Sequence, residues 1–140
     1  MRSTLIDAGP LIALFDRDDA FHDMVKSYLE DFHGRLVTTW PVITEASHLL
    51  SFSSLAQVGL MTWMKRSGVR IFPLGVEHLD RLIQLVKKYS DLPLDLADGS
   101  LVVAAEDTAA TDILTIDSDY SVYRTASGRA IRNILRKQER

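Results

Sequence analysis

Short apolar runs alternate along this chain with longer stretches of helical periodicity. Four runs are rich in aliphatic or β-branched residues and short enough to be strands. We expect strands at residues 3–6, 36–39, 69–72 and 113–116. In the stretches between them, apolar residues recur every three or four positions, as on one face of an α-helix. This alternation predicts an α/β fold with a mostly parallel sheet covered by helices on both faces.

The helical stretches carry recognisable start and stop signals. Gly34 is placed to end one helix, and Pro41 is placed to begin the next. We expect helices at residues 10–15, 19–32, 41–50, 55–64 and 76–89, and a further one that follows Asp95. The C-terminal part is ambiguous, because Tyr120–Arg124 fits a turn or an edge strand and Ile131 fits a last strand or a helix.

Size and composition are those of one water-soluble domain. A chain of 140 residues with 46% hydrophobic and 25% charged residues can bury a core without further help. We therefore expect a single domain over residues 1–140, with no membrane-spanning segment and no secretion signal. The absence of cysteine excludes disulfides and thiol chemistry and agrees with a cytoplasmic location. A net charge of −3 argues against nucleic-acid binding by bulk electrostatics alone.

Two acidic residues follow predicted strands, and two more lie near the starts of predicted helices. Asp7 comes directly after the first strand, before Gly9 and Pro10, and Asp117 comes directly after the fourth. Glu45 lies one turn into its helix, near the start, and Asp98 lies in the first turn of the helix that follows Asp95. Right-handed crossovers bring these positions to one edge of a parallel sheet, where ligands bind in open α/β folds. The sequence thus predicts four carboxylates at one place.

Each of these acids also has a purely structural explanation. An aspartate before a helix is a common N-cap, and a carboxylate near a helix N-terminus is favoured by the dipole. Asp95 and Asp98 form a pattern close to a capping box. What capping leaves unexplained is the group of small residues that follows Asp98, which would let this helix pack closely near the sheet edge. From Arg124 onward the chain is basic, which is usually a solvated surface but could face an anionic partner.

Clustered carboxylates repel one another unless a cation lies between them. Oxygen ligands without histidine or cysteine select Mg²⁺ or Mn²⁺, and such an ion keeps water on its remaining positions. This kind of site suits phosphate esters, because the ion activates a water molecule and neutralises charge on the phosphoryl oxygens. The residues alone therefore predict metal-dependent chemistry on a phosphodiester.

Four short motifs, in this order, resemble PIN-domain proteins, specifically the toxin ribonucleases of type II toxin-antitoxin modules. They are Leu5-Ile6-Asp7-Ala8-Gly9-Pro10-Leu11-Ile12-Ala13, Thr44-Glu45, Asp91-Leu92-Pro93-Leu94 with Ala97-Asp98, and Leu114-Thr115-Ile116-Asp117. The resemblance spans nearly the whole chain. It implies a three-layer α/β/α PIN-like fold with a central sheet of four or five strands. It places the family's near-invariant acids on Asp7, Glu45 and Asp98 and its more variable fourth acid on Asp117, with Asp119 as the alternative.

The resemblance further implies a Mg²⁺- or Mn²⁺-dependent endoribonuclease, inhibited by a cognate antitoxin and commonly a homodimer. We expect Asp7, Glu45 and Asp98 to hold the metal, with Asp117 as a direct or water-mediated ligand. Asp95 is an additional acid, expected mainly as a cap that reaches the metal through water. The alternative is a PIN-like module without catalysis that binds RNA or protein. The retained acids argue against this alternative.

Overall fold

The computed structural model describes residues 2–135, and within them five strands form one sheet. The strands are β1 Ser3–Ile6, β2 Arg35–Thr38, β3 Arg70–Ile71, β4 Asp112–Leu114 and β5 Arg132–Asn133. Their order across the sheet is β3-β2-β1-β4-β5, and every neighbouring pair is parallel. The expected parallel sheet is confirmed, and β5 shows that the ambiguous C-terminal segment supplies a last strand.

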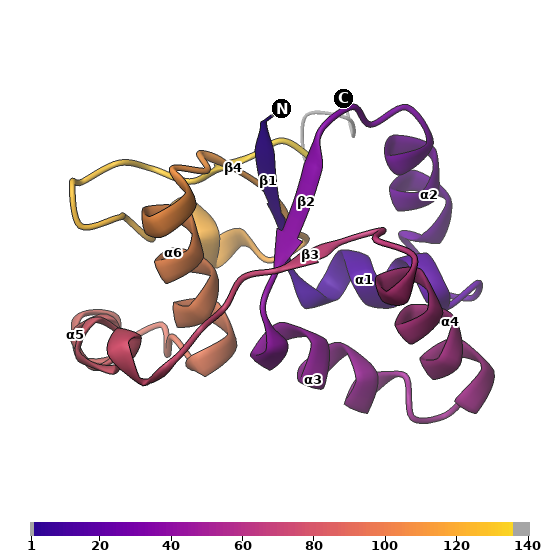
Figure 1. Ribbon diagram of the computed structural model, residues 1–140, viewed down its shortest axis with the longest axis horizontal. Coiled ribbons are helices and arrows are strands. Elements are labelled where there is room, and N and C mark those ends of the chain that lie inside the picture. Colours follow the sequence, from indigo (N-terminus) through magenta and orange to yellow (C-terminus); the bar gives the residue numbers. More distant parts are fainter. Residues whose placement is uncertain (1, 136–140) are drawn as a thin grey trace.

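Helices cover the sheet on both sides, as the alternating pattern predicted. They are α1 Ala8–Phe15, α2 His22–Glu30, α3 Trp40–Leu49, α4 Ser54–Lys65, α5 Leu79–Lys88 and α6 Leu96–Thr108. Figure 1 shows α5 and α6 to the left of the strands, and α1 to α4 to the right and below. Short 3₁₀ turns lie at Val76–His78 and Ser118–Ser121. Within residues 2–135, none of the helices has both the length and the apolar character that crossing a bilayer requires.

The path of the chain reverses at β1, and this reversal positions the site. From β1 the chain steps outward to β2 and β3, and it then returns through α5 and α6 to β4 on the other side of β1. The helices on either side of such a reversal leave a crevice beyond the carboxyl ends of the two central strands. In this protein, Asp7 follows the end of β1 at this crevice.

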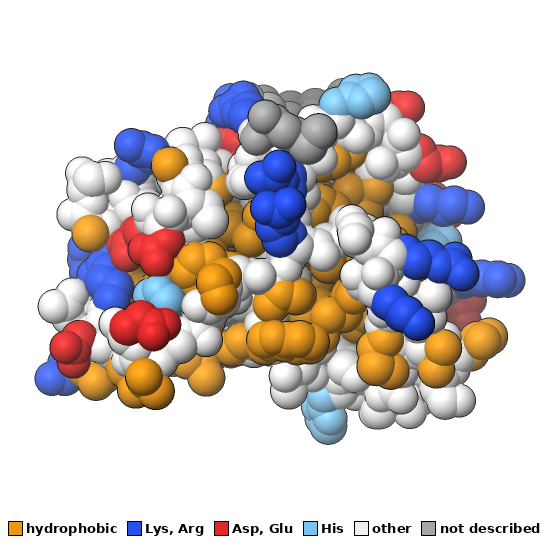
Figure 2. Space-filling view, in the orientation of Figure 1, with side chains coloured by type: hydrophobic (Ala, Val, Ile, Leu, Met, Phe, Trp, Pro, Cys, Tyr) orange, Lys and Arg blue, Asp and Glu red, His pale blue; other side chains and the backbone are white. Residues whose placement is uncertain are grey.

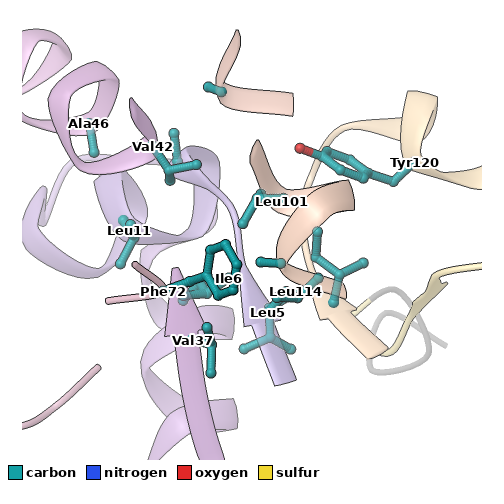
Figure 3. Close-up of a cluster of buried hydrophobic side chains, with 14 of the residues drawn as sticks. Leu5, Ile6, Leu11, Val37, Val42, Ala46, Phe72, Leu101, Leu114 and Tyr120 are labelled. Atoms are coloured by element: carbon teal, nitrogen blue, oxygen red, sulfur yellow. The ribbon is translucent and has the colours of Figure 1, made fainter. Parts of the chain in front are cut away.

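The core lies on both faces of β1 and is completed by α6. Leu5 and Ile6 are fully buried, because a central parallel strand is covered on both sides. Figure 3 shows both side chains among others from α1, β2, α3, α6 and β4. The small residues of α6 allow a close approach to α5: a Cβ at Gly99 would lie 3.0 Å from a methyl carbon of Leu82. The tight packing expected for this helix is therefore observed.

The predicted helix at residues 19–32 is shorter in the structure and spans only His22–Glu30. Asp19 turns the chain before the helix begins, because its carboxylate accepts a hydrogen bond from the amide of Phe21 at 2.8 Å. Its carbonyl accepts a second bond from the amide of His22. These local hydrogen bonds hold residues 19–21 in a turn, so α2 begins at His22 and not at Asp19, where the apolar periodicity had placed its start.

The fourth strand also differs from its prediction at residues 113–116. β4 begins at Asp112 and ends at Leu114, so Asp117 stands three residues beyond the strand. The strand ends early because the Thr115 amide bonds to the side chain of Asn133, and the Thr115 hydroxyl accepts the amide of Asp117. The expectation that Asp117 repeats the position of Asp7 is therefore wrong. Thr115 takes that position instead.

Candidate functional site

Five carboxylates line one open cleft beyond the carboxyl ends of β1 and β4. The cleft has a volume of about 370 Å³. Its acidic residues are Asp7, Glu45, Asp95, Asp98 and Asp117. The structure thus brings together all four acids predicted from the sequence and the additional Asp95. Asp119 is the one predicted candidate that does not line the cleft.

Asp7 lies deepest, with only 7% of its surface exposed. It occupies the N-cap position of α1, yet its side chain makes no capping hydrogen bond to the helix. Its Oδ2 instead accepts a hydrogen bond of 3.0 Å from the hydroxyl of Thr115. Burial raises the pKa of Asp7 to about 6, and the nearby charges of Glu45 and Asp117 add to this rise. Capping therefore does not account for Asp7.

Glu45 reaches the cleft from the second turn of α3. Thr39 caps this helix, since its hydroxyl accepts the amide of Val42 at 3.4 Å, and Pro41 fits the first turn. The same hydroxyl bonds to Ser100 on α6 at 2.5 Å, which ties the start of α3 to the helix that carries Asp98. Partial burial is the main cause that raises the pKa of Glu45, and the negative charges of Asp95 and Asp117 raise it further. The position of Glu45 is thus fixed by a buried contact between two helices.

Asp98 lies in the first turn of α6 and takes part in two kinds of contact. It forms the predicted capping box, in which the Asp98 amide donates to Asp95 Oδ1 at 2.8 Å and the Asp95 amide donates to Asp98 Oδ2 at 3.3 Å. Its Oδ1 also accepts the hydroxyl of Tyr120 at 3.1 Å. Burial raises the pKa of Asp98 to about 7, and repulsion from Asp95 and Asp7 contributes. Capping is confirmed here, but it accompanies strong electrostatic coupling to the other acids.

Asp117 and Asp119 belong to the turn after β4. Asp117 is exposed and caps the 3₁₀ turn Ser118–Ser121, because its Oδ1 accepts the amide of Asp119 at 2.9 Å. Its side chain still borders the cleft, and its charge raises the pKa of both Asp7 and Glu45. Of the two candidates for the fourth acid, Asp117 is therefore the one at the cleft.

Sequence reasoning missed two hydroxyl groups that hold these acids. Thr115 is buried beside Asp7, and Tyr120 is buried beside Asp98. Thr115 could have been found from the register, because Ile6 pairs with Leu114 and the next residues of two parallel strands are neighbours. Nothing in the sequence pattern marks Tyr120, which comes from a loop that folds back under α6.

The donor chemistry of the cleft fits a hard divalent cation. Its acidic side chains offer only oxygen, and no histidine, lysine or arginine is among the described residues that line it. Within residues 2–135, no three acidic, histidine or cysteine side chains stand close enough to share one ion. The cleft therefore matches a divalent cation in its charge and in its oxygen donors. The carboxylates are spread around the cleft and do not converge on one point.

The raised pKa values predict how the stability of metal-free protein depends on pH. In the unfolded chain both Asp7 and Asp98 return to about 3.9, so the folded state binds protons more tightly. The free energy of unfolding then falls as the pH rises through about 6 and 7. Because Asp98 is only partly buried, we expect a loss on the order of 1 kcal/mol between pH 5.5 and pH 8, measured by thermal denaturation in EDTA.

The control for this pH profile is the double variant Asp7→Asn, Asp98→Asn. Its stability should change less between the same two pH values than that of the wild type. Excess Mn²⁺ should likewise flatten the wild-type profile, because a bound cation favours the charged form of both carboxylates and so lowers both pKa values. A wild-type profile that rises from pH 5.5 to pH 8 in EDTA would contradict the electrostatic description of the cleft.

Among the described residues, the basic side chains of the C-terminal segment do not line the cleft. Arg132 pairs with Asp112 at the start of β4, the opposite end of the strand, at 3.1 and 3.2 Å. Arg124 donates to the carbonyls of Ser121 and Tyr123. Arg136, Lys137 and Arg140 lie outside the described residues. The guanidinium groups of Arg124 and Arg132 are thus engaged within the protein.

A larger groove of about 990 Å³ lies near the amino ends of β2 and β3. Figure 2 shows hydrophobic side chains on its floor, between the strands at the centre of the view and α2 and α4 at the right. Phe15 and Trp63 pack against each other there, with ring centroids 5.7 Å apart. Glu30 is its one acidic lining residue among those described. It is therefore no candidate for the cation chemistry, despite its size.

Comparison with known proteins agrees with this fold. The sequence model of the PIN domain family matches residues 4–126. Ribonuclease VapC26 of Mycobacterium tuberculosis (strain ATCC 25618 / H37Rv) is 24% identical over 127 residues, which are 89% of this chain and 94% of that protein.

Two solved structures share the fold. The first is VapC20 of Mycobacterium tuberculosis, described as a toxin that cleaves the sarcin-ricin loop, with a TM-score of 0.77 and 16% identity over 85% of this chain and 93% of that one. The second is PAE2754 from Pyrobaculum aerophilum, with a TM-score of 0.61 and 20% identity over 99% of this chain and 96% of that one.

Proposed function

This chain belongs to the PIN-domain family, and from that premise we propose that it is a Mg²⁺- or Mn²⁺-dependent endoribonuclease, the toxin of a toxin-antitoxin pair. The observation that carries the proposal is the single cleft in which Asp7, Glu45, Asp98 and Asp117 meet. These acids come from four separate segments of the chain. Burial, together with repulsion between neighbouring acids, raises the pKa of Asp7 and Asp98. Such shifts cost folding free energy and are typical of functional sites.

The residues expected to hold the ion are Asp7, Glu45 and Asp98, with Asp117 bound directly or through water. Asp95 caps α6 and adds negative charge at the rim. Bound there, a divalent ion would act as a Lewis acid toward water and offset negative charge that develops on the phosphoryl oxygens. Without a cation, five carboxylates would repel a phosphodiester, so substrate entry itself requires the ion.

The protein side chains determine what kind of attack is available. Thr115 holds the buried carboxylate of Asp7 in place through its hydrogen bond, and Asp7 in turn faces the cleft. Among the described residues, the cleft offers no histidine or lysine that could take the proton of an RNA 2′-hydroxyl. Water is therefore the proposed nucleophile, and the proposed products carry a 5′-phosphate and a 3′-hydroxyl.

The partners proposed with this activity are an RNA substrate and a cognate antitoxin. The support is the similarity to a curated VapC ribonuclease and the shared fold with a solved VapC toxin. An antitoxin that reaches the cleft would meet a strongly acidic surface, so we propose that it presents a basic side chain there. A homodimer and a cytoplasmic location complete the proposal.

The experiment that tests the proposal is the mapping of RNA ends after expression of the wild type and of Asp7→Asn. We expect new 5′ ends at defined positions in cells that make the wild-type protein and none in cells that make the variant. The alternative is a PIN-like module that binds RNA or protein without cutting. Identical RNA ends in both strains, at equal protein levels and with Mg²⁺ and Mn²⁺ supplied, would favour that alternative.

A further inference from the structure

The carboxylate of Asp98 is held from beneath by two tyrosines of the C-terminal loop. The hydroxyl of Tyr120 donates to Oδ1 at 3.1 Å, and the hydroxyl of Tyr123 donates to Oδ2 at 3.5 Å. Both tyrosines are fully buried, whereas Asp98 is half-buried and lines the cleft. The acid thus has one side toward the cleft and the other against phenol groups that solvent does not reach.

The Tyr120 ring is fixed by its neighbours. It packs edge to face on Tyr123 at 5.1 Å, and Tyr123 packs in the same manner on Tyr89 at 5.1 Å. Tyr89 is anchored in turn, because its hydroxyl accepts the amide of Arg124 at 2.9 Å. In Figure 3 the Tyr120 ring reaches inward from its loop, with its hydroxyl oxygen at the end toward α6. The hydroxyl is therefore presented to Asp98 by a rigid stack of rings.

The packing of the Tyr120 ring does not explain why this residue carries a hydroxyl group. A phenylalanine at residue 120 would fill the same space and make the same edge contact with Tyr123. A buried hydroxyl without a partner is unfavourable, and within residues 2–135 the Tyr120 hydroxyl has Asp98 as its one hydrogen-bond partner. The hydroxyl is thus matched specifically to this carboxylate.

We propose that Tyr120 is a positioning residue that holds the carboxylate of Asp98 in the orientation in which it binds the divalent ion. This inference rests on the proposed function. The donated hydrogen bond occupies one acceptor position on Oδ1 and leaves the other free for the cleft. Together with the Asp95 amide, which donates to Oδ2, it fixes the rotation of the Asp98 carboxylate at both oxygens. Groups that hold metal ligands in this way contribute roughly 10- to 100-fold to metal affinity.

The test is the binding of Mn²⁺ to the full chain at pH 7.5 without RNA, followed by isothermal titration calorimetry. We expect the Kd for Mn²⁺ to rise about 10-fold in Tyr120→Phe relative to the wild type. We expect a smaller rise in Tyr123→Phe, because its contact with Asp98 is longer. In cleavage assays, the Mn²⁺ concentration that gives half-maximal rate should rise with the Kd. The KM for RNA at saturating Mn²⁺ should stay unchanged.

The matched control is Tyr89→Phe, which removes a phenol hydroxyl from the same stack without touching Asp98. This variant loses the bond from the Arg124 amide, so its melting temperature should fall while its Kd for Mn²⁺ stays at the wild-type value. An equal rise in Kd for Tyr89→Phe and Tyr120→Phe would overturn the inference, because packing would then explain both.

Failure of this inference can be told apart from failure of the proposed function. If the wild type binds Mn²⁺ and cuts RNA while Tyr120→Phe binds Mn²⁺ equally well, the positioning role is overturned and the nuclease stands. If the wild type neither binds Mn²⁺ nor cuts RNA, the proposed function is overturned and the positioning role with it.

Discussion

Asp7→Asn should lose RNA cleavage by roughly 10³-fold or more while its metal-free form becomes more stable than the wild type. The first effect is expected because Asp7 is the most buried acid of the cleft, and the ion it would hold is worth several kcal/mol to the transition state. The second follows from the pKa of about 6, since the folded protein no longer has to keep a buried charge at pH 8. Cleavage rates and thermal denaturation in EDTA at pH 8 measure the two effects.

A loss of cleavage together with a gain of stability is expected if Asp7 is a metal ligand. A structural cap would instead lose stability when it is replaced. Asparagine still accepts the hydrogen bond of Thr115, so the variant keeps its local contact and loses only the charge. We expect a gain of about 2 kcal/mol at most, because the neutral amide is still buried. Asp16→Asn, an aspartate outside the cleft, is the matched control and should change neither quantity. A large loss of stability in Asp7→Asn would instead favour a structural role.

Removal of divalent metal should abolish cleavage, and its return should restore it. The cleft carries five acids and, among the described residues that line it, no cationic side chain, so the protein alone has nothing to offset the charge of a phosphodiester. We expect no cleavage in excess EDTA and full recovery with Mg²⁺ or Mn²⁺. The products should have a 5′-phosphate, tested with an exonuclease that requires this group, and a 3′-hydroxyl, tested by ligation.

A substrate with a single 2′-deoxy nucleotide at the cleavage position gives an independent check. With water as nucleophile, the 2′-hydroxyl takes no part in bond breaking, so this substrate should still be cut. A 2′,3′-cyclic phosphate end, or undiminished cleavage in EDTA, would contradict the proposed chemistry. Ca²⁺ makes a useful comparison ion, because its larger and more flexible coordination tests whether the cleft demands a small cation.

The alternation of apolar runs and helical stripes was sufficient to predict the parallel sheet and the edge at which the acids meet. These features follow from periodicity and from the handedness of crossovers, which are local or general rules. The positions of Asp7, Glu45 and Asp98 on their elements were predicted correctly for this reason. The ligand role of these acids stays a prediction.

The predictions from sequence failed at two kinds of place. In one, a side chain forms a hydrogen bond with the backbone nearby; in the other, segments far apart in the sequence are in contact. Asp19 delayed the start of α2, and Thr115 ended β4 early, each through a hydrogen bond that apolar periodicity does not register. Tyr120 was missed because its contact with Asp98 depends on the path of the last loop. The Tyr120 contact is set by tertiary structure, and a single sequence carries no signal for it.

The hydrogen bond between Asp7 and Thr115 joins residues 108 positions apart. β1 is the central strand, and its second neighbour, β4, is synthesised only after helices α1 to α6. A nascent chain that ends before residue 112 therefore carries Asp7 beside an unpaired strand edge and lacks Asp117 altogether. The acidic cleft is therefore completed only after the segment that carries Thr115 and Asp117 has been synthesised and has paired with β1.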